Sequence, residues 1–424
     1  MEMIPFAKPL LGDNEIEAVR RVILSGWVTQ GPKVEEFENA FASYSGARFA
    51  CAVSSCTTAL HVALATVGVR PGDVVITVSH SFIATANAVR YCGAEPVFVD
   101  IAPDTYCISV DSLKQCLHND CERKSGRLFY KNLFNLALAY SPLRYIASGK
   151  PKKAGRVIGR VSAILVVHQM GMPCNLKEIL ALAKKFNIPV VEDAACAAGS
   201  EIKIANRWDK IGKPHGDIAC FSFHPRKIIT TGDGGMLTTE NPEYDRHFRL
   251  LRQHGMSISD SLRHSLRKIT FEKYLITGYN YRMTDLQAAI GIEQLKRLPE
   301  MVKKRRELAK VYKIYLPKID WLEALNEPDY CRTNWQSYPV KIKPHAPISR
   351  NRLMQYLLDR GIPTRRGIMN AHQERPYKSC KLALPVSERM RDMVILLPFF
   401  DSLKKSQIDF IIKMLMQTGK LHGK

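Results

Sequence analysis

Short apolar runs alternate with amphipathic stretches along the first part of the chain. The apolar runs lie at 49–53, 73–78, 96–100 and 161–167. The stretches between them, such as 59–67, 83–91 and 176–186, carry apolar residues at helical spacing. Strands buried on both faces form continuous apolar runs, and parallel strands need crossover helices between them. The alternation therefore predicts an α/β fold with a mostly parallel sheet.

The N-terminal pattern predicts two helices that are joined by a tight turn within residues 13–44. Asp13 is suited to the N-cap of the first helix because its carboxylate can accept from a free backbone N–H. Ile16, Val19 and Ile23 would share one face of that helix. We therefore expect these three side chains to point into the core.

The length of the chain predicts two domains. A chain of 424 residues is longer than one hydrophobic core usually serves. A charged stretch after Pro299 is typical of a helix that leads out of the first domain, and 335–341 is typical of a strand in the second. We expect a large domain over 1–297 and a smaller C-terminal α+β domain over 298–424.

A basic block at 118–160 interrupts the alternation of strands and helices. Its acidic residues are limited to Asp120 and Glu122 among many lysines and arginines. The middle of the block, 128–146, is apolar enough to form one face of a helix. Our main interpretation is an inserted helix that packs on its own subunit or on a partner. The alternative is a helix that lies on a membrane surface, with basic flanks.

The composition is that of a folded globular protein in a reducing compartment. Apolar residues make up 46% of the chain and charged residues 24%. No apolar stretch is long enough for a membrane span, and the N-terminus lacks the pattern of a signal peptide, so we expect a cytoplasmic protein. The eleven cysteines are scattered in apolar contexts, which favours reduced thiols. The tightest group, Cys116 to Cys121, lacks zinc-ligand spacing, so no metal site is expected.

The net charge of +22 favours an anionic ligand. We find no helix-turn-helix, zinc-finger or RNA-recognition signature, and the basic residues are spread over the whole chain. Attraction of small anionic substrates, or a generally basic proteome, explains the charge as well as a nucleic-acid partner would, and we expect no specific nucleic-acid binding.

Two stretches carry candidate chemistry. Lys227 lies in an apolar run that is followed by a glycine cluster, 232–235. Burial would lower the pKa of this lysine and make it a nucleophile toward an aldehyde, although an exposed lysine on a hairpin fits the pattern too. Asp193 ends a short apolar strand, where α/β proteins bind ligands. A lysine and a carboxylate are the two groups that pyridoxal 5′-phosphate (PLP) needs, for the Schiff base and for the ring nitrogen.

These stretches, with several other motifs, resemble the DegT/StrS family of PLP-dependent sugar-nucleotide aminotransferases. The other resembling segments lie at 4–6, 26–32, 52–60, 71–73, 84–87 and 278–285. The resemblance implies the type I, aspartate aminotransferase-like fold. It covers nearly the whole chain, and the block at 118–160 departs from it.

The resemblance also implies a role for individual residues. Lys227 would form the Schiff base and move the proton, and Asp193 would hold the ring nitrogen. The other implied cofactor contacts are Cys56, Thr57 and Ser222 at the phosphate, Phe82 stacked on the ring, His168 and Cys196 beside it, and Asn280 at the phosphate of the other subunit. Implied substrate contacts are Trp27, Thr29, Arg282 and His372. Capping, packing or an ion pair would explain several of these residues equally well. The family usually has glycine at Cys56 and glutamine or histidine at Cys196.

By this resemblance the protein is a homodimeric aminotransferase with shared active sites. It would move an amino group from glutamate to a nucleotide-linked keto sugar, in amino-sugar biosynthesis for a surface polysaccharide or glycoconjugate. Lys227 favours this reaction over the dehydratases of the family, which carry histidine there. A dehydrating or aromatising PLP enzyme of the same fold, and a regulatory protein without turnover, are the alternatives.

Overall fold

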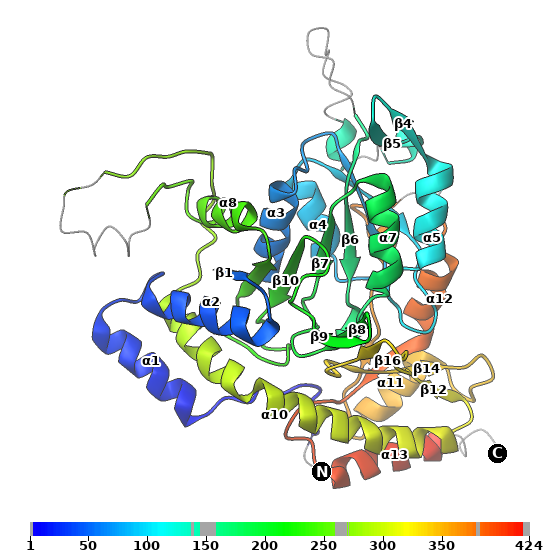
Figure 1. The fold of residues 1–424 in the computed structure, drawn as a ribbon. Helices are drawn as coiled ribbons and strands as arrows, with labels where there is room; N and C mark the ends of the chain where they lie inside the picture. The colour runs from blue at the N-terminus through cyan, green and yellow to red at the C-terminus, as the bar shows by residue number, and fades with distance from the viewer. Residues whose placement is uncertain are drawn as a thin grey trace.

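The computed structural model describes residues 3–136, 140–144, 158–258, 269, 271–378 and 382–418 (Figure 1). A seven-stranded sheet lies at its centre, in the order β1-β11-β10-β7-β6-β2-β3. The strands are β1 (Phe49–Val53), β2 (Val74–Val78), β3 (Glu95–Val99), β6 (Val161–Val167), β7 (Val190–Asp193), β10 (Ile218–Ser222) and β11 (Gly235–Thr239). β11 runs antiparallel to both its neighbours, and the other strand pairs are parallel. The predicted mostly parallel α/β fold is confirmed.

Helices cover both faces of this sheet (Figure 1). They are α2 (Pro32–Ser45), α3 (Cys56–Thr66), α4 (Ala84–Tyr91), α5 (Val110–Gln115), α7 (Leu176–Phe186) and α8 (Pro242–Arg252). Along β1, Cys51 and Val53 pack with the core that holds α3 and α8, whereas Ala50 and Ala52 pack with the core of α2 and α7. Successive strand residues point to opposite faces, so a continuous apolar strand fills both cores.

The C-terminal part of the chain forms a second sheet of four strands, in the order β12-β14-β16-β15. Its elements are β12 (Leu322–Ala324), β14 (Tyr338–Ile342), β15 (Arg365–Arg366) and β16 (Val394–Leu397), with helices α11 (Arg350–Leu358), α12 (Pro385–Met393) and α13 (Lys405–Thr418). β13 (Cys331–Arg332) pairs instead with the hairpin β8 (Glu201–Ile204) and β9 (Arg207–Lys210). The second sheet has a core of its own, which includes Leu308, Tyr338 and Leu353.

One helix joins the two cores. α10 (Asp285–Tyr315) is a single helix of 31 residues that continues through Pro299, whereas the sequence suggested a new helix after that proline. Leu298 and Met301 pack in the core of the large sheet on either side of the proline, so tertiary packing outweighs the lost backbone hydrogen bond. The domain division that we propose at 297–298 falls inside this helix.

The first helix faces a different way from the expectation. α1 (Asp13–Ser25) leaves Ile16 67% and Ile23 58% exposed, and it buries Ala18 and Val22. The buried Glu15 explains this rotation, because its carboxylate is held by Gln294 and Arg297 of α10. Gly12 is the N-cap instead of Asp13, and its backbone N–H donates to the Glu15 carboxylate at 2.8 Å.

The inserted block begins with the end of a short π-helix, Cys116–Asp120, and continues as a hairpin. Residues 121–130 form a hairpin of β4 (Cys121–Lys124) and β5 (Arg127–Tyr130), followed by a short 3-10 turn at Leu133–Asn135. Ser125 and Gly126 have φ of 49° and 76°, the geometry of a tight hairpin turn that suits the right-handed twist of the strands. The predicted helix over 128–146 is therefore wrong for its first part, and residues 137–139 and 145–157 lie outside the described residues.

The surface of the insertion is apolar only in places. Leu128 and Phe129 are buried, whereas Phe134 is 96% exposed.

Within the described residues, no helix is long and apolar enough to span a membrane. The same part of the chain contains no group of three or more His, Cys, Asp or Glu side chains that could hold a metal ion.

A buried ion pair joins α10 to the turn between β16 and α13 and generates a stability prediction. Arg305 and Asp401 are joined at 2.9 Å, with side chains 5% and 4% exposed. Asp401→Ala would leave the guanidinium buried without its counter-charge, which costs about 3–5 kcal/mol of unfolding free energy. Urea unfolding followed by circular dichroism measures this loss.

The matched control is Glu17→Ala, because Glu17 forms an exposed ion pair with Arg20. Exposed pairs contribute little, so this variant should unfold at the same urea concentration as the unchanged protein. Equal midpoints for Asp401→Ala and Glu17→Ala would contradict the stabilising role of the buried pair.

Candidate active site

The carboxyl ends of two central strands lie at one edge of the large sheet. β7 and β10 pair in parallel, with Asp193 opposite Cys220, and the Ala194 N–H donates to the Cys220 carbonyl at 2.8 Å. Asp193 ends β7, and Ser222 ends β10. Polar side chains at this edge face the crevice in which open α/β sheets bind ligands.

Asp193 is a buried carboxylate with two donors. The Thr85 hydroxyl donates to Oδ2 at 2.8 Å, and the Ala195 N–H donates to Oδ1 at 3.1 Å. The side chain belongs to a residue that is only 5% exposed. Burial raises the pKa of Asp193, and the hydrogen bond from Thr85 is the largest interaction that opposes this rise.

Lys227 lies on the loop after β10 and points to the segment after β7. Its Nζ donates to Cys196 Sγ at 3.0 Å. The residue is half-buried. Burial favours the neutral amine, but the Cys196 thiol, Cys56 and Asp193 outweigh it, so the pKa of Lys227 is raised. The expected lowering of the pKa is therefore wrong for the protein without its cofactor, because the interactions of the amine with Cys196, Cys56 and Asp193 outweigh its desolvation.

The glycine cluster lets β11 approach helix α3 closely. A Cβ on Gly235 would lie 2.4 Å from the Ser55 carbonyl and 2.7 Å from the Cys56 N. Gly235 is also the partner of Ser222 in the antiparallel pair of β10 and β11. The close approach therefore brings Ser222 into the same corner as the N-terminus of α3.

The N-terminus of α3 supplies free backbone N–H groups in this corner. Ser55 is the N-cap, and its hydroxyl accepts from the Thr58 N–H at 3.2 Å. Cys56 and Thr57 follow in the first turn of the helix. Burial, with the nearby charge of Asp193, raises the pKa of the Cys56 thiol, while Lys227 opposes the rise. Cys56, Asp193 and Lys227 thus interact electrostatically, as the sequence motifs imply.

Phe82 and His168 differ in how far they are exposed. Phe82 is 65% exposed, three residues before Thr85, so its ring is open to a ligand. His168 is fully buried, and its Nδ1 accepts from the Cys174 N–H at 3.1 Å. Its Nε2 therefore carries the proton and donates to Glu192 at 2.9 Å. Both ring nitrogens of His168 are in use, which favours its structural role.

The turn that carries Trp27 and Thr29 is fastened to the start of α10. The Asp285 carboxylate accepts from the backbone N–H groups of Gly31, Lys33 and Val34 at 2.8–3.0 Å. The Asp285 N–H donates in return to the Thr29 carbonyl at 3.0 Å. Trp27 Nε1 donates to the Gln30 carbonyl, within the turn itself. This arrangement places the turn beside the segment of Asn280, which is exposed, and Arg282, which is half-buried.

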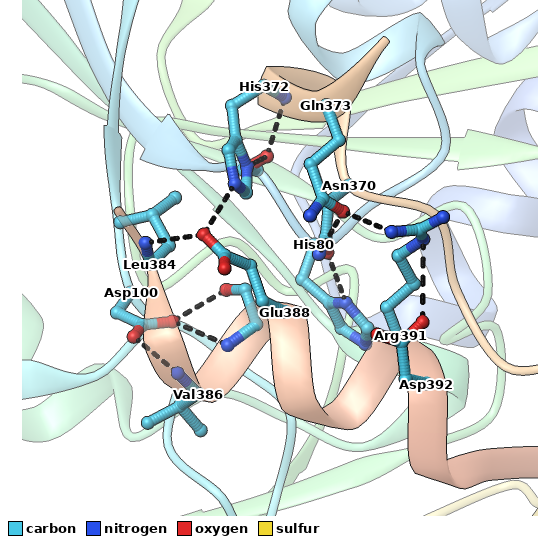
Figure 2. A network of polar contacts seen from close by, with 12 residues as sticks. His80, Asp100, Asn370, His372, Gln373, Leu384, Val386, Glu388, Arg391 and Asp392 are labelled. Atoms are coloured by element: carbon cyan, nitrogen blue, oxygen red, sulfur yellow. Dashed lines mark hydrogen bonds and ion pairs between the residues drawn. The ribbon is translucent and has the colours of Figure 1, made fainter. Parts of the chain in front are cut away.

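His372 lies in a polar network between the large sheet and α12 (Figure 2). Its Nδ1 lies 2.6 Å from the Ser79 hydroxyl, and its Nε2 lies 3.1 Å from the Glu388 carboxylate. Burial lowers the pKa of His372, and the hydrogen bond to Glu388 opposes the change. A neutral ring with both nitrogens engaged fits a link between elements, and a substrate role for His372 remains a prediction that this geometry does not favour.

Asn334 and Gln336, which the sequence motifs do not include, bind the backbone on both sides of the site. Asn334 Nδ2 donates to the carbonyls of Cys196 and Ala198 at 2.9 and 2.8 Å. Gln336 Nε2 donates to the Arg226 carbonyl at 2.5 Å. The loop after β7 and the loop before Lys227 are therefore joined through one stretch of the small domain. The sequence gives no signal for this role, because the acceptors are backbone carbonyls.

The set of residues fits PLP. A buried carboxylate suits a protonated ring nitrogen, and an amine suits the aldehyde. The helix N-terminus with Thr57 and Ser222 suits a phosphate dianion. Phe82 offers an open aromatic face for the ring. These groups come from α3, the turn before α4, β7 and β10, and they meet at one sheet edge.

Comparison with known proteins gives the same assignment. The sequence profile of the DegT/DnrJ/EryC1/StrS aminotransferase family matches residues 9–122 and 150–416. The chain belongs to this family. Its members use PLP, and the protein is a PLP-dependent aminotransferase of the type I fold. The profile leaves residues 123–149 unmatched, and these lie within the basic block at 118–160.

Individual relatives cover nearly the whole chain. An uncharacterised protein of Methanocaldococcus jannaschii, MJ1066, is 32% identical over 410 residues, which cover 96% of this chain and 95% of that protein. The aminotransferase TlmJ from Streptoalloteichus hindustanus is 30% identical, with a TM-score of 0.80 and 98% of both chains covered. DesV of S. venezuelae, solved with a ketimine intermediate, is 25% identical, with a TM-score of 0.80 and 99% of both chains covered.

The contact between Lys227 and Cys196 predicts a change in cofactor uptake. Cys196→Ala removes an interaction that raises the pKa of Lys227, so the pKa of the lysine falls and more neutral amine is present at neutral pH. We expect the cofactor-free variant to bind PLP covalently faster than the unchanged protein does, at pH values below the pKa of the lysine. The increase in absorbance after mixing with PLP, measured as a function of pH, gives this rate.

Cys92→Ala is the matched control, because Cys92 is a thiol buried between α3 and α4 whose Sγ faces the His61 carbonyl. It should leave the rate and its pH dependence unchanged. A Cys196→Ala variant that takes up PLP more slowly at neutral pH would contradict the electrostatic role of the thiol.

Proposed function

We propose that the enzyme transfers an amino group from glutamate to a nucleotide-linked keto sugar, as one step of amino-sugar biosynthesis. The observation that supports this most directly is the convergence of Lys227, Asp193 and the N-terminus of α3 at one sheet edge. The family resemblance supports the choice of substrates. The net charge of +22 suits an anionic nucleotide and an anionic amino donor.

Each group of the site has a separate task in this proposal. When bound, PLP supplies an electron sink for the carbon that loses its proton. Asp193 holds the ring nitrogen in its protonated form, and the first turn of α3 with Ser222 binds the phosphate. Lys227 anchors the cofactor and later holds and moves a proton at its Nζ. Cys196 Sγ accepts a hydrogen bond from that nitrogen at 3.0 Å, which favours the charged form of the amine.

A homodimer with shared sites is part of the proposal. α1 exposes Ile16, Ile23 and Leu24 by 67%, 58% and 70%. The described residues 271–275 also expose Phe271 by 83% and Tyr274 by 64%. Exposed apolar side chains are typical of surfaces that another subunit covers. Asn280 is exposed on the same segment, which suits a contact to the phosphate of a second subunit.

A reducing, cytoplasmic location completes the proposal. The described cysteines all carry free thiols, and each of them except Cys196 is buried. Oxidising compartments favour disulfides, so a set of buried free thiols suits a reducing one.

Replacement of the lysine tests the reaction. With glutamate and a panel of nucleotide-linked keto sugars, mass spectrometry should detect an amino sugar from the unchanged enzyme. Lys227→Ala removes the covalent anchor and the proton carrier, so turnover should fall roughly a thousandfold or more and the absorbance of lysine-bound PLP should disappear. Lys177→Ala, at an exposed position of α7, is the matched control and should keep both. Full turnover by Lys227→Ala would refute the assignment of the lysine.

A mixing experiment tests the shared site. Lys227→Ala and Asn280→Ala are each inactive or weak if Asn280 serves the partner's cofactor. In a mixed dimer, the subunit with an intact lysine then receives an intact asparagine from the other subunit. We expect mixing after mild dissociation to restore part of the wild-type activity, with one working site per mixed dimer. If activity stays at the level of the separate variants while native mass spectrometry detects mixed dimers, Asn280 does not act across the interface.

A further inference from the structure

Thr85 makes a side-chain contact to Asp193, and the family resemblance at 84–87 assigns it no role. It lies in the first turn of α4 (Ala84–Tyr91), and its hydroxyl donates to Asp193 Oδ2 at 2.8 Å. Thr85 is 2% and Asp193 is 5% exposed, so water does not compete freely for this bond. The Ala195 N–H donates to Oδ1 at 3.1 Å. Each carboxylate oxygen therefore keeps acceptor capacity for a cation in the crevice.

The Thr85 bond to Asp193 fixes the direction of a second hydrogen bond, between the hydroxyls of Ser81 and Thr85. Ser81 Oγ lies 2.8 Å from Thr85 Oγ1, and Ser81 is 4% exposed. A threonine hydroxyl has one proton, and Thr85 uses it toward Asp193. Ser81 must then donate to Thr85, so the protons point in sequence from Ser81 through Thr85 to the carboxylate. Phe82 lies between these two residues and is open to a ligand.

We propose that Thr85, supported by Ser81, is a positioning residue that keeps Asp193 ionised and correctly oriented toward the ring nitrogen of PLP. This inference rests on the proposed function, because it gives Asp193 the protonated ring as its partner. The turn at 81–85 then supplies both the aromatic face that covers the ring and the hydroxyl that holds the carboxylate at its nitrogen.

The electrostatic surroundings explain why Asp193 needs this donor. Burial raises the pKa of Asp193, and the Thr85 bond is the largest of the interactions that lower it. Lys227, from the loop after β10, and His168, from the end of β6, also lower it. The thiols of Cys56 on α3 and Cys220 on β10 face the same carboxylate. A hydrogen bond to the ionised form favours that form, whereas a methyl group at the same place does not.

The test compares Thr85→Val with Thr85→Ser in the full-length protein, with PLP as the probe. Thr85→Val keeps the shape and removes the donor, and we expect roughly 10- to 100-fold weaker PLP binding. Loss of the bond raises the pKa of Asp193, so the loss of PLP affinity on acidification should begin at a higher pH than in the unchanged protein. Thr85→Ser restores the hydroxyl and should return both values toward those of the unchanged protein. Equilibrium dialysis and the absorbance of bound PLP provide readouts that do not depend on turnover.

Thr77→Val is the matched control, since Thr77 is a fully buried threonine of β2 whose hydroxyl donates to the Leu165 carbonyl at 2.8 Å. Its PLP affinity and pH dependence should not change. Equal losses in Thr77→Val and Thr85→Val would indicate general damage to the sheet and would overturn the inference. Unchanged PLP binding by Thr85→Val would overturn it as well, while the proposed function would stand.

Two further outcomes keep the test decisive. If the unchanged protein does not bind PLP, the proposed function fails, and this inference fails with it. If Thr85→Val does not fold, Ser81→Ala replaces it, because this variant removes the donor behind Thr85 and leaves the threonine in place. A smaller shift in the same direction supports the inference, and an unshifted pH dependence overturns it.

Discussion

The ionised state of one buried carboxylate is the condition on which the active site depends. Asp193 lies at a sheet edge where burial favours its neutral form. Two hydrogen-bond donors and the ammonium of Lys227 oppose that tendency. The parallel pairing of β7 and β10 makes this possible, because it delivers the aspartate and the lysine loop to the same edge from separate parts of the sequence. Without these neighbours, burial would raise the pKa of the carboxylate further and favour the neutral form, which suits a cationic ring less well.

Close packing and the small domain hold these groups in place. Gly235 lets β11 approach the first turn of α3 more closely than any side chain would allow, which brings Ser222 to the corner where the helix offers its N–H groups. Asn334 and Gln336 then bind the backbone carbonyls on both sides of the Lys227–Cys196 contact. Arg305 donates to the carbonyl of Gln336, so the stretch is anchored to α10. A shift of the small domain would therefore move both walls of the site.

The sequence predicted the features that local chemistry determines. Apolar runs identified the large sheet, and the motifs around Asp193 and Lys227 identified the two groups that converge. It did not predict the hairpin at 121–130, because the apolar residues there fit a helical face as well as a strand, and the turn at Ser125 and Gly126 carries a weak signal. It also misjudged the exposed face of α1, which depends on the distant partners of Glu15. The sign of the Lys227 pKa shift needed the positions of three neighbours that are remote in sequence.

The two departures from the family pattern are best understood as one change. Cys56 stands where the family usually has glycine, and Cys196 stands where it usually has glutamine or histidine. The thiol of Cys196 contributes to the raised pKa of Cys56, so the two side chains are electrostatic neighbours, and both act on Lys227. The thiol at 196 lies against the lysine nitrogen, where an amide or imidazole would offer a different hydrogen-bonding group. The two departures therefore meet at the lysine, whose pKa both cysteines raise.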